Sequence, residues 1–384
     1  AVNRQLVSDV PVGALLSGGV DSSAIVYIAK KKINNLKTFT IDFKSSKESY
    51  SSDLPYAKLV SKHLNVPLEV VEVTPEKMIT NLEKMIWILD EPIADPAALN
   101  VYFISKIARE QGIKVLLSGT GGDDIFTGYR RHKALKIEKY WNWIPKNYIS
   151  ISRSFLNLLS KDILIIRRID KALSGFEMEN EDRLINYFKW TNREDLEELF
   201  SSELKNALKG NNPNKVIIDY LNTLGENFNQ MDKMLAIEQR FFLGDHNLIY
   251  NDKMSMYAGV EIRVPFLDKD LVNYASEIPL KYKQNIFHNK FILKKAFENK
   301  LPKKVLYRSK NGFGVPLRGW LKNELKDWLN DLLSETKIKK RGFFNPTKVQ
   351  KLIKSNFDGK VDASYTLFSI ACIEIWCNHF LDNT

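Results

Sequence analysis

The sequence predicts an α/β fold with a parallel sheet and extensive helical additions, and two observations support this prediction. In the first third of the chain, short apolar runs alternate with longer amphipathic segments, as strands joined by crossover helices do. The remainder is mainly helical in pattern, with no linker rich in Gly, Ser or Pro. We therefore expect the helical part to pack on the sheet.

The strands of this sheet are predicted at residues 12–16, 36–43, 66–73 and 113–118. Helices, which carry apolar residues at three- and four-residue intervals, are predicted at residues 22–32, 53–64, 76–89 and 96–110. Strands this apolar are covered on both faces, and ligands of such sheets bind at the carboxyl ends of the strands. The chemistry is therefore expected just after Leu16, Phe43 and Leu117.

The chain length and the pattern shifts predict how the molecule is divided. A chain of 384 residues forms about two or three packed units, and 44% hydrophobic with 27% charged residues excludes collagen-like or wholly disordered classes. We expect a nucleotide-binding core at 1–130, a variable helical insertion at 131–230 and a helical C-terminal part of the same domain at 231–384. Within that part, residues 261–268 are predicted to form a turn packed on the sheet, and residues 308–316 break the helical pattern.

Charge, hydropathy and cysteine content restrict the partners. The formal charge is +11, but the basic clusters are short and scattered, so no nucleic-acid partner is expected. No apolar run approaches the roughly 18–20 residues of a membrane helix, so no membrane partner is expected either. Cys372 and Cys377 lie five apart in a helical pattern, where they cannot form a bridge, and buried thiols favour a cytoplasmic location. The five histidines lack the spacing of a zinc site or a Ser-His-Asp triad.

The most informative motif is Ser-Gly-Gly-Val-Asp-Ser-Ser at residues 17–23, which follows a predicted strand and begins a helix. Its glycines let the backbone approach a polyanion, and its hydroxyls and the free amides of the helix start can donate to phosphate oxygens. Asp21 would repel phosphate directly, so we expect it to hold a Mg²⁺ ion. The spacing is neither that of a Walker loop nor that of a Rossmann loop. A structural strand-to-helix turn is the alternative interpretation.

This motif resembles the pyrophosphate loop of the ATP pyrophosphatase superfamily, whose members cleave ATP between the α and β phosphates and adenylate a substrate. Further motifs follow at residues 118–129, 252–256, 261–268 and 290–313. Together they resemble the synthetase domain of glutamine-hydrolysing asparagine synthetase and its relatives, including β-lactam synthetase. The resemblance runs from residue 6 to the last helix and is weakest between residues 131 and 229.

The resemblance implies a role for each matching residue. The residues implied to hold the triphosphate and then pyrophosphate are Ser17, Gly18, Gly19, Asp21, Ser22 and Ser23. Those implied to contact the adenosine moiety are Leu16, Ile41, Ser118 and Gly119. Asp21 and Asp123 match the magnesium-binding aspartates. The implied catalytic residues are Asp123, Lys290 and Lys310, because fixed cations stabilise charge that builds on the phosphates and the carbonyl oxygen.

The resemblance also implies the fold, the cofactors and the reaction. The fold would be of the adenine-nucleotide α-hydrolase type, with ATP and Mg²⁺ as cofactors. The enzyme would adenylate a carboxylate, aspartate in the family, and transfer ammonia or glutamine-derived nitrogen to it, releasing AMP and pyrophosphate. Amidation or cyclisation of another carboxylate, such as a sugar acid or secondary metabolite, is an alternative. An RNA-modifying ATP pyrophosphatase and a silent nucleotide-binding module are others. A homodimer is a candidate oligomeric state.

Two features depart from the family pattern. Asparagine synthetases carry a glutamate, which helps manage protons during attack by ammonia, where this chain has Thr120. A threonine hydroxyl has no pKa near neutrality, so Asp123, Asp124, Glu91 or water would take that role, and a carboxylate other than aspartate becomes a candidate acceptor. The N-terminal glutaminase domain with its catalytic cysteine is absent from this sequence. We therefore expect a domain that was removed or left out, free ammonia, or a separate glutaminase partner.

Overall fold

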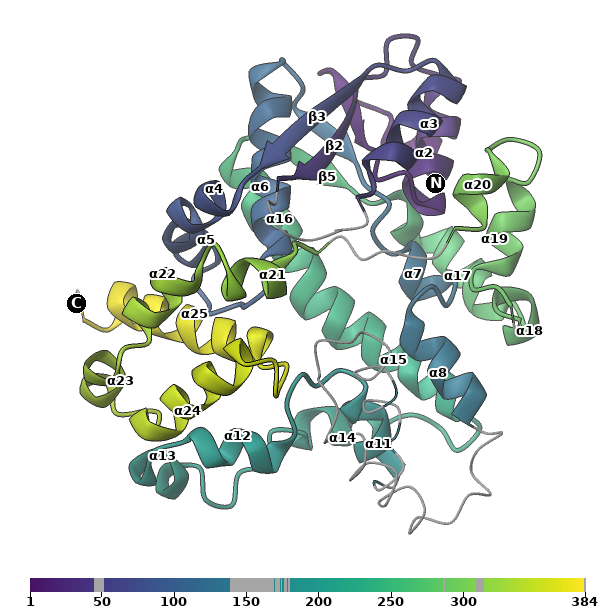
Figure 1. Cartoon of the computed structure of the whole chain (residues 1–384). Coiled ribbons are helices and arrows are strands. Elements are labelled where there is room, and N and C mark those ends of the chain that lie inside the picture. The colour runs from purple at the N-terminus through teal and green to yellow at the C-terminus, as the bar shows by residue number, and fades with distance from the viewer. Residues whose placement is uncertain are drawn as a thin grey trace. The chain divides into compact units, whose positions relative to one another are not determined.

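The computed structural model describes residues 1–44, 52–138, 169, 173, 175, 178, 180–285, 287–308 and 314–382. The chain divides into two units (Figure 1). Unit 1 comprises residues 1–90, 95–133 and 238–316 and contains the sheet. Unit 2 comprises residues 91–94, 134–237 and 317–384, and its described elements are helices.

The sheet of unit 1 has five parallel strands in the order β3-β2-β1-β4-β5. They are β1 (Val12–Leu15), β2 (Thr38–Phe43), β3 (Leu68–Val73), β4 (Val115–Leu117) and β5 (Glu261–Arg263). The predicted α/β fold with a parallel sheet is therefore confirmed, and the four predicted strands agree with the structure to within two residues at each end. The strand order changes direction between β1 and β4, which is the position where open α/β sheets bind ligands.

The fifth strand was not predicted, and the turn expected at residues 261–268 is wrong for its first three residues. Glu261–Arg263 pairs with β4 in parallel, and the Ser118 amide donates to the Arg263 carbonyl at 2.8 Å. The turn is confined to a 3₁₀ segment, Pro265–Leu267. Three residues are too few to show the alternation that identifies a strand, so pairing with β4 decides this conformation.

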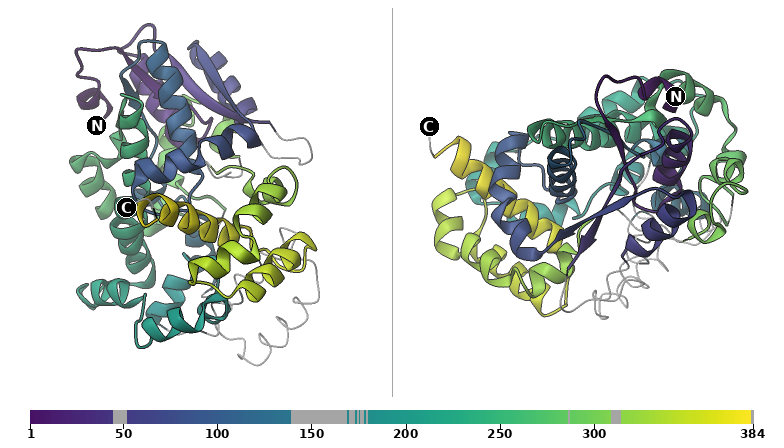
Figure 2. Two further views of the ribbon diagram at one scale, coloured as in Figure 1. Left: turned by 90° about the vertical axis from the view of Figure 1, so that its left-hand side faces the viewer. Right: turned by 90° about the horizontal axis from the view of Figure 1, so that it is seen from above.

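Helices cover both faces of the sheet. Figure 1 and Figure 2 place α2 (Val20–Lys30) and α3 (Leu54–Leu64) on one face, with α6 (Ala97–Glu110) and α16 (Ile249–Tyr257) on the other. The single helix predicted at residues 76–89 is instead two helices, α4 (Pro75–Thr80) and α5 (Leu82–Leu89). They separate at Asn81, whose side chain donates to the Lys77 carbonyl and so competes with the helical backbone pattern.

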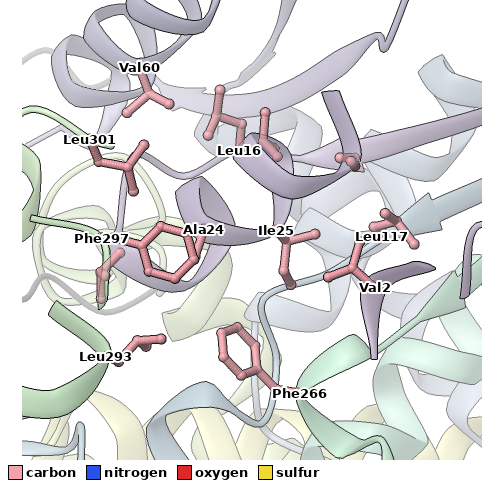
Figure 3. Close-up of a cluster of buried hydrophobic side chains, with 14 of the residues drawn as sticks. Val2, Leu16, Ala24, Ile25, Val60, Leu117, Phe266, Leu293, Phe297 and Leu301 are labelled. Atoms are coloured by element: carbon pink, nitrogen blue, oxygen red, sulfur yellow. The ribbon is translucent and has the colours of Figure 1, made fainter. Parts of the chain in front are cut away.

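A cluster of buried apolar side chains joins the sheet to α2 (Figure 3). Leu16, which follows β1, and Leu117, the last residue of β4, are fully buried in the same cluster as Ile25 of α2. Phe266 and Phe297 close the cluster from the second half of the sequence. The two strand ends that carry the polar loops therefore stand on a rigid apolar base.

The other elements of unit 1 are α1 (Val2–Gln5), α7 (Gly122–Ile125), the π-helix η2 (Glu238–Leu248), α17 (Lys269–Glu277), α18 (Leu280–Lys283), α19 (Phe291–Ala296) and α20 (Lys303–Leu306). Helix α8 (Arg130–Glu138) crosses from unit 1 into unit 2.

Unit 2 contains α11 (Asn180–Asn186), α12 (Arg193–Leu199), α13 (Ser202–Ala207), α14 (Lys215–Asn222), α15 (Gln230–Ile237), α21 (Leu317–Lys322), α22 (Lys326–Leu332), α23 (Glu335–Arg341), α24 (Pro346–Phe357) and α25 (Ser364–Phe380). Cys372 and Cys377 are buried on α25 as free thiols, as predicted. Among the described residues, no helix combines the length and the apolar character that crossing a membrane requires.

Candidate functional site

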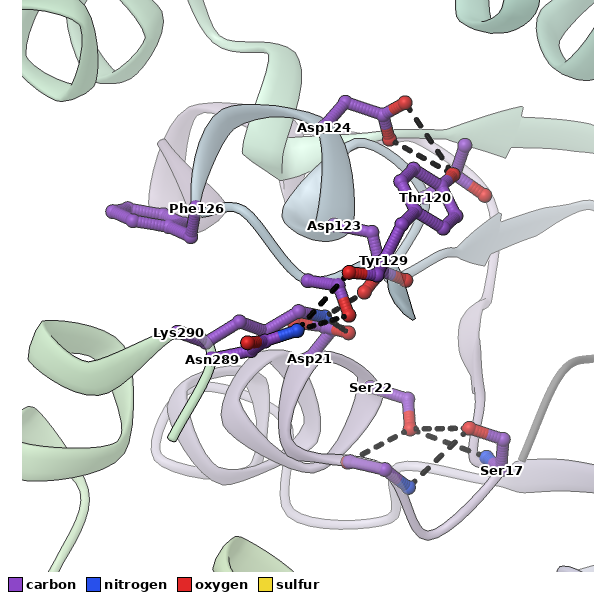
Figure 4. Close-up of polar contacts among 12 residues, drawn as sticks. Ser17, Asp21, Ser22, Thr120, Asp123, Asp124, Phe126, Tyr129, Asn289 and Lys290 are labelled. Carbon is purple, nitrogen blue, oxygen red and sulfur yellow. Dashed lines mark hydrogen bonds and ion pairs between the residues drawn. The ribbon is translucent and has the colours of Figure 1, made fainter. Parts of the chain in front are cut away.

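The first polar loop, residues 17–23, runs from the end of β1 into the first turn of α2, and its glycines and serines determine its shape. Gly18 has φ +68°, and a Cβ atom there would lie 2.5 Å from the carbonyl carbon of Tyr56. Only glycine combines this φ with so close an approach to α3. Ser22 accepts a hydrogen bond from the Ser17 amide at 3.2 Å, and the two hydroxyl oxygens lie 3.1 Å apart (Figure 4). These bonds fold the loop back over the start of α2.

The second polar loop, residues 118–129, lies directly against the first. A Cβ atom on Gly122 would lie 2.6 Å from Oδ1 of Asp21, and one on Gly119 would lie 2.9 Å from the Ser22 amide nitrogen. A side chain on Gly119 would force the loops apart, and one on Gly122 would displace the Asp21 carboxylate. The second loop therefore faces the first.

A buried lysine joins the two loops. Lys290 pairs with Asp21 of the first loop, and its Nζ lies 2.6 Å from Oδ1 of Asp123 in the second (Figure 4). Its side chain is only 5% exposed. Burial opposes the positive charge, but the Asp123 and Asp21 carboxylates outweigh it and raise the pKa of Lys290 above its ordinary value. The lysine therefore remains an ammonium ion that pairs with both aspartates.

Neighbouring side chains fix Lys290 and the second loop. Lys290 has φ +53° as the N-cap of α19. The amide of Asn289 donates to the Gly128 carbonyl at 3.2 Å and to the Tyr129 carbonyl at 3.1 Å. The Tyr129 hydroxyl lies 3.4 Å from both carboxylate oxygens of the buried Asp124. Burial, together with Asp124 and Asp123, raises the pKa of Tyr129 well above its ordinary value, so the phenol stays protonated and donates.

The pair Asp21 and Asp123 fits a magnesium ion in its donor chemistry. Both carboxylates already share one cation, the Lys290 ammonium, so they approach closely enough to share another. The described part of the chain holds no group of three or more His, Cys, Asp or Glu side chains suited to a metal. Mg²⁺ does not require one, because it is commonly bound through one or two carboxylates together with substrate phosphates.

The remaining predicted residues occupy different environments. Leu16 is fully buried, and Ile41 is 7% exposed. Ser23 is fully buried on α2, and its hydroxyl makes no hydrogen bond to a described residue. The Ser118 hydroxyl lies 2.9 Å from the hydroxyl of Thr120, the residue that departs from the family pattern. Lys310 lies outside the described residues.

Sequence reasoning missed Arg308, which the structure places beside the first loop. Its guanidinium pairs with Asp53 at 2.9 Å, and Nη2 lies 3.5 Å from the Ser17 carbonyl oxygen. In the sequence, Arg308 marks only the start of a segment with little helical signal. Its contacts come from the distant α3 and from the first loop, so no local pattern could have identified it.

The sequence matches the asparagine synthase family model over residues 1–378. A glutamine-hydrolysing asparagine synthetase 1 of Bacillus subtilis is 32% identical over 380 residues, which cover 98% of this chain and 57% of that protein. A putative glutamine-hydrolysing asparagine synthetase of Mycobacterium bovis is 27% identical over 390 residues, covering 100% and 57%. An amidase of Penicillium rubens is 24% identical over 388 residues, covering 93% and 57%.

The chain thus spans 57% of the length of these relatives. The match to the family model extends over both units, including the helical segments where sequence motifs are sparse. It includes both polar loops and the lysine between them. The chain belongs to the asparagine synthase family.

Proposed function

We propose that the protein is an ATP- and Mg²⁺-dependent carbon–nitrogen ligase. A carboxylate oxygen of the substrate attacks the α-phosphorus of ATP, and pyrophosphate leaves. Ammonia, free or derived from glutamine, then attacks the activated carbonyl carbon. The amide forms, AMP leaves with the electron pair of the broken bond, and the nitrogen loses a proton.

One observation supports this proposal above all: two polar loops meet at the switch point of the sheet and hold two aspartates around one lysine. The first loop leads through Gly19, the N-cap of α2, into the first turn of that helix, whose backbone amides have no partner within the helix. Backbone amides in this arrangement bind phosphate oxygens well. A purely structural turn would not require two carboxylates and a buried cation at the same place.

The residues of the site divide the work according to their charge. Asp21 and Asp123 would hold the magnesium ion, which neutralises phosphate charge as it builds. Lys290 would stabilise the leaving pyrophosphate, because a fixed ammonium lowers the energy of developing negative charge. Lys310 is proposed for the same task from the sequence motif alone. Tyr129 and Asn289 position the second loop through their hydrogen bonds.

The proposed acceptor is a carboxylate other than aspartate, and Thr120 favours this choice. Its hydroxyl lies 2.9 Å from the Ser118 hydroxyl and its amide donates to the same oxygen at 3.2 Å. A threonine in this position cannot accept the proton of attacking ammonia, whereas a glutamate can. The family reaction with aspartate is the second candidate.

Pyrophosphate release by the purified protein with MgATP and an ammonium salt tests both candidates. The assay compares L-aspartate with a panel of sugar acids, amino acids and other small carboxylates. We expect pyrophosphate release to depend on a carboxylate of the panel other than aspartate, and mass spectrometry to detect the corresponding amide. Efficient conversion of aspartate to asparagine would overturn the altered acceptor but not the ligase. No carboxylate-dependent release, together with no uptake of MgATP by calorimetry, would overturn the ligase itself.

A further inference from the structure

Arg308 is a buried cation at the first polar loop that the proposed mechanism does not yet use. It follows α20, and its side chain is 9% exposed. Removing a guanidinium from water is costly unless other groups replace the lost hydrogen bonds. The groups that contact the Arg308 guanidinium therefore show what compensates for its burial.

Three groups from two separate segments surround the guanidinium. Nη1 pairs with the Asp53 carboxylate at 2.9 Å, and the central carbon lies 4.5 Å from the centroid of the Tyr56 ring. Nη2 lies 3.5 Å from the Ser17 carbonyl oxygen. Asp53 is the N-cap residue of α3, yet its carboxylate makes no capping bond to the described backbone of that helix. An aspartate at this position ordinarily caps its helix, so its orientation toward Arg308 is a departure.

The guanidinium also borders the turn where a polyanion would lie. A Cβ atom placed on Gly19 would be 3.7 Å from Nη2, so the guanidinium lies beside the side of Gly19 that carries no side chain. Arginine has five N–H donors in a planar fork, and the contacts with Asp53 and Ser17 use two of them. The fork matches phosphate oxygens in geometry and charge.

We propose that Arg308 binds the polyphosphate of a nucleotide held at the first loop, and that Asp53 pairs with its guanidinium only while no phosphate is bound. This inference rests on the proposed function, because it requires a phosphate ligand in that loop. Arg308 would be a phosphate contact in addition to Lys290. Asp53, in contrast, would compete with phosphate for the same cation.

The competition makes the proposal testable with two substitutions of opposite effect. Calorimetry with magnesium pyrophosphate would compare the unaltered protein with Arg308→Ala, Arg308→Lys and Asp53→Asn. We expect Arg308→Ala to lose roughly ten- to a hundredfold in affinity, as when a hydrogen bond to a charged group is removed. Arg308→Lys should recover part of the loss. Asp53→Asn should bind pyrophosphate at least as tightly as the unaltered protein, because the arginine keeps its charge and loses its competing carboxylate.

A merely structural role for Arg308 predicts a different pattern. If the arginine only anchors the loop to α3, Asp53→Asn breaks the same anchor and weakens binding as much as Arg308→Ala does. That result would overturn the inference, as would unchanged affinity in Arg308→Ala. Arg4→Ala is the control, because it also removes one positive charge from an ion-paired arginine. Arg4 is exposed, and its two ion pairs are with Asp268 and Asp270. We expect it to bind like the unaltered protein.

Two further measurements separate this inference from the proposed function. Adenosine binding should be unaffected in Arg308→Ala, because the substitution acts on the phosphate end of the site. Melting temperatures without ligand report whether each variant folds. If Arg308→Ala does not fold, the milder Arg308→Lys and Asp53→Asn variants still test the inference. Failure of the unaltered protein to bind pyrophosphate or MgATP would overturn the proposed function and this inference together. Binding by the unaltered protein with equal binding by Arg308→Ala would overturn the inference alone.

Discussion

The Nζ atom of Lys290 lies 2.6 Å from Oδ1 of Asp123, and the lysine side chain is 5% exposed. The same ammonium pairs with Asp21 from the other loop. A single cation therefore offsets the repulsion between two carboxylates that lie close together. The pair holds together segments from distant parts of the sequence, so its loss affects both stability and chemistry.

Replacing the lysine should destabilise the protein strongly. Lys290→Met leaves two neighbouring carboxylates without their cation, and breaking a buried ion pair in this way costs about 3–5 kcal/mol. Urea denaturation would measure the loss. The control is Lys295→Met on the same helix, whose exposed pair with Glu298 contributes about 0–1 kcal/mol. Equal losses in the two variants would show that the Lys290 pair is not structurally important.

The same ion pair predicts a loss of stability at alkaline pH. The folded-state pKa of Lys290 is raised above its ordinary value of 10.5. Its contribution is therefore complete below the ordinary pKa and disappears as the pH rises through the higher folded-state pKa. Urea midpoints measured from neutral pH to above 10.5 should fall more steeply in the unaltered protein than in Lys290→Met. Parallel curves would contradict this assignment.

Removing a proposed magnesium ligand should impair turnover much more than folding. We expect Asp21→Asn to lower the rate of pyrophosphate release about a hundredfold or more, the effect of losing one preorganised electrostatic contact. Its pair with Lys290 would also weaken, so the melting temperature must be measured alongside. The exposed Asp270→Asn is the control. An unchanged rate in Asp21→Asn would contradict the role of Asp21 as a magnesium ligand.

Adding a single methyl group to Gly128, in the second polar loop, should impair the site. A Cβ atom on Gly128 would overlap the Asp123 carboxylate and the Lys290 side chain. These side chains can shift, so we expect Gly128→Ala to fold and yet lose turnover, up to about a hundredfold for a displacement on the order of 1 Å. Gly225→Ala is the control, because a methyl group there would have no described atom within 4 Å. Full activity of Gly128→Ala would show that the pair tolerates displacement.

Several elements could be predicted from local sequence because their signals are local. β1 and α2 follow from an apolar run, a glycine turn and a helical pattern, and the free cysteines of α25 follow from their spacing. In contrast, β5 is too short to show a period and exists because β4 pairs with it. Asn81 divides the predicted helix at residues 76–89 through a side-chain bond that the apolar pattern does not reveal.

The sequence by itself determined the fold class, the order of the first four strands along the chain and the two polar loops that carry Asp21 and Asp123. Periodicity and glycine placement are properties of neighbouring residues, so they can be read before the chain folds. Only the tertiary structure decided that Lys290 lies between those aspartates and that Arg308 borders Ser17. Such contacts join segments far apart in the chain, and their geometry depends on how the packed core brings the strand ends and later helices together.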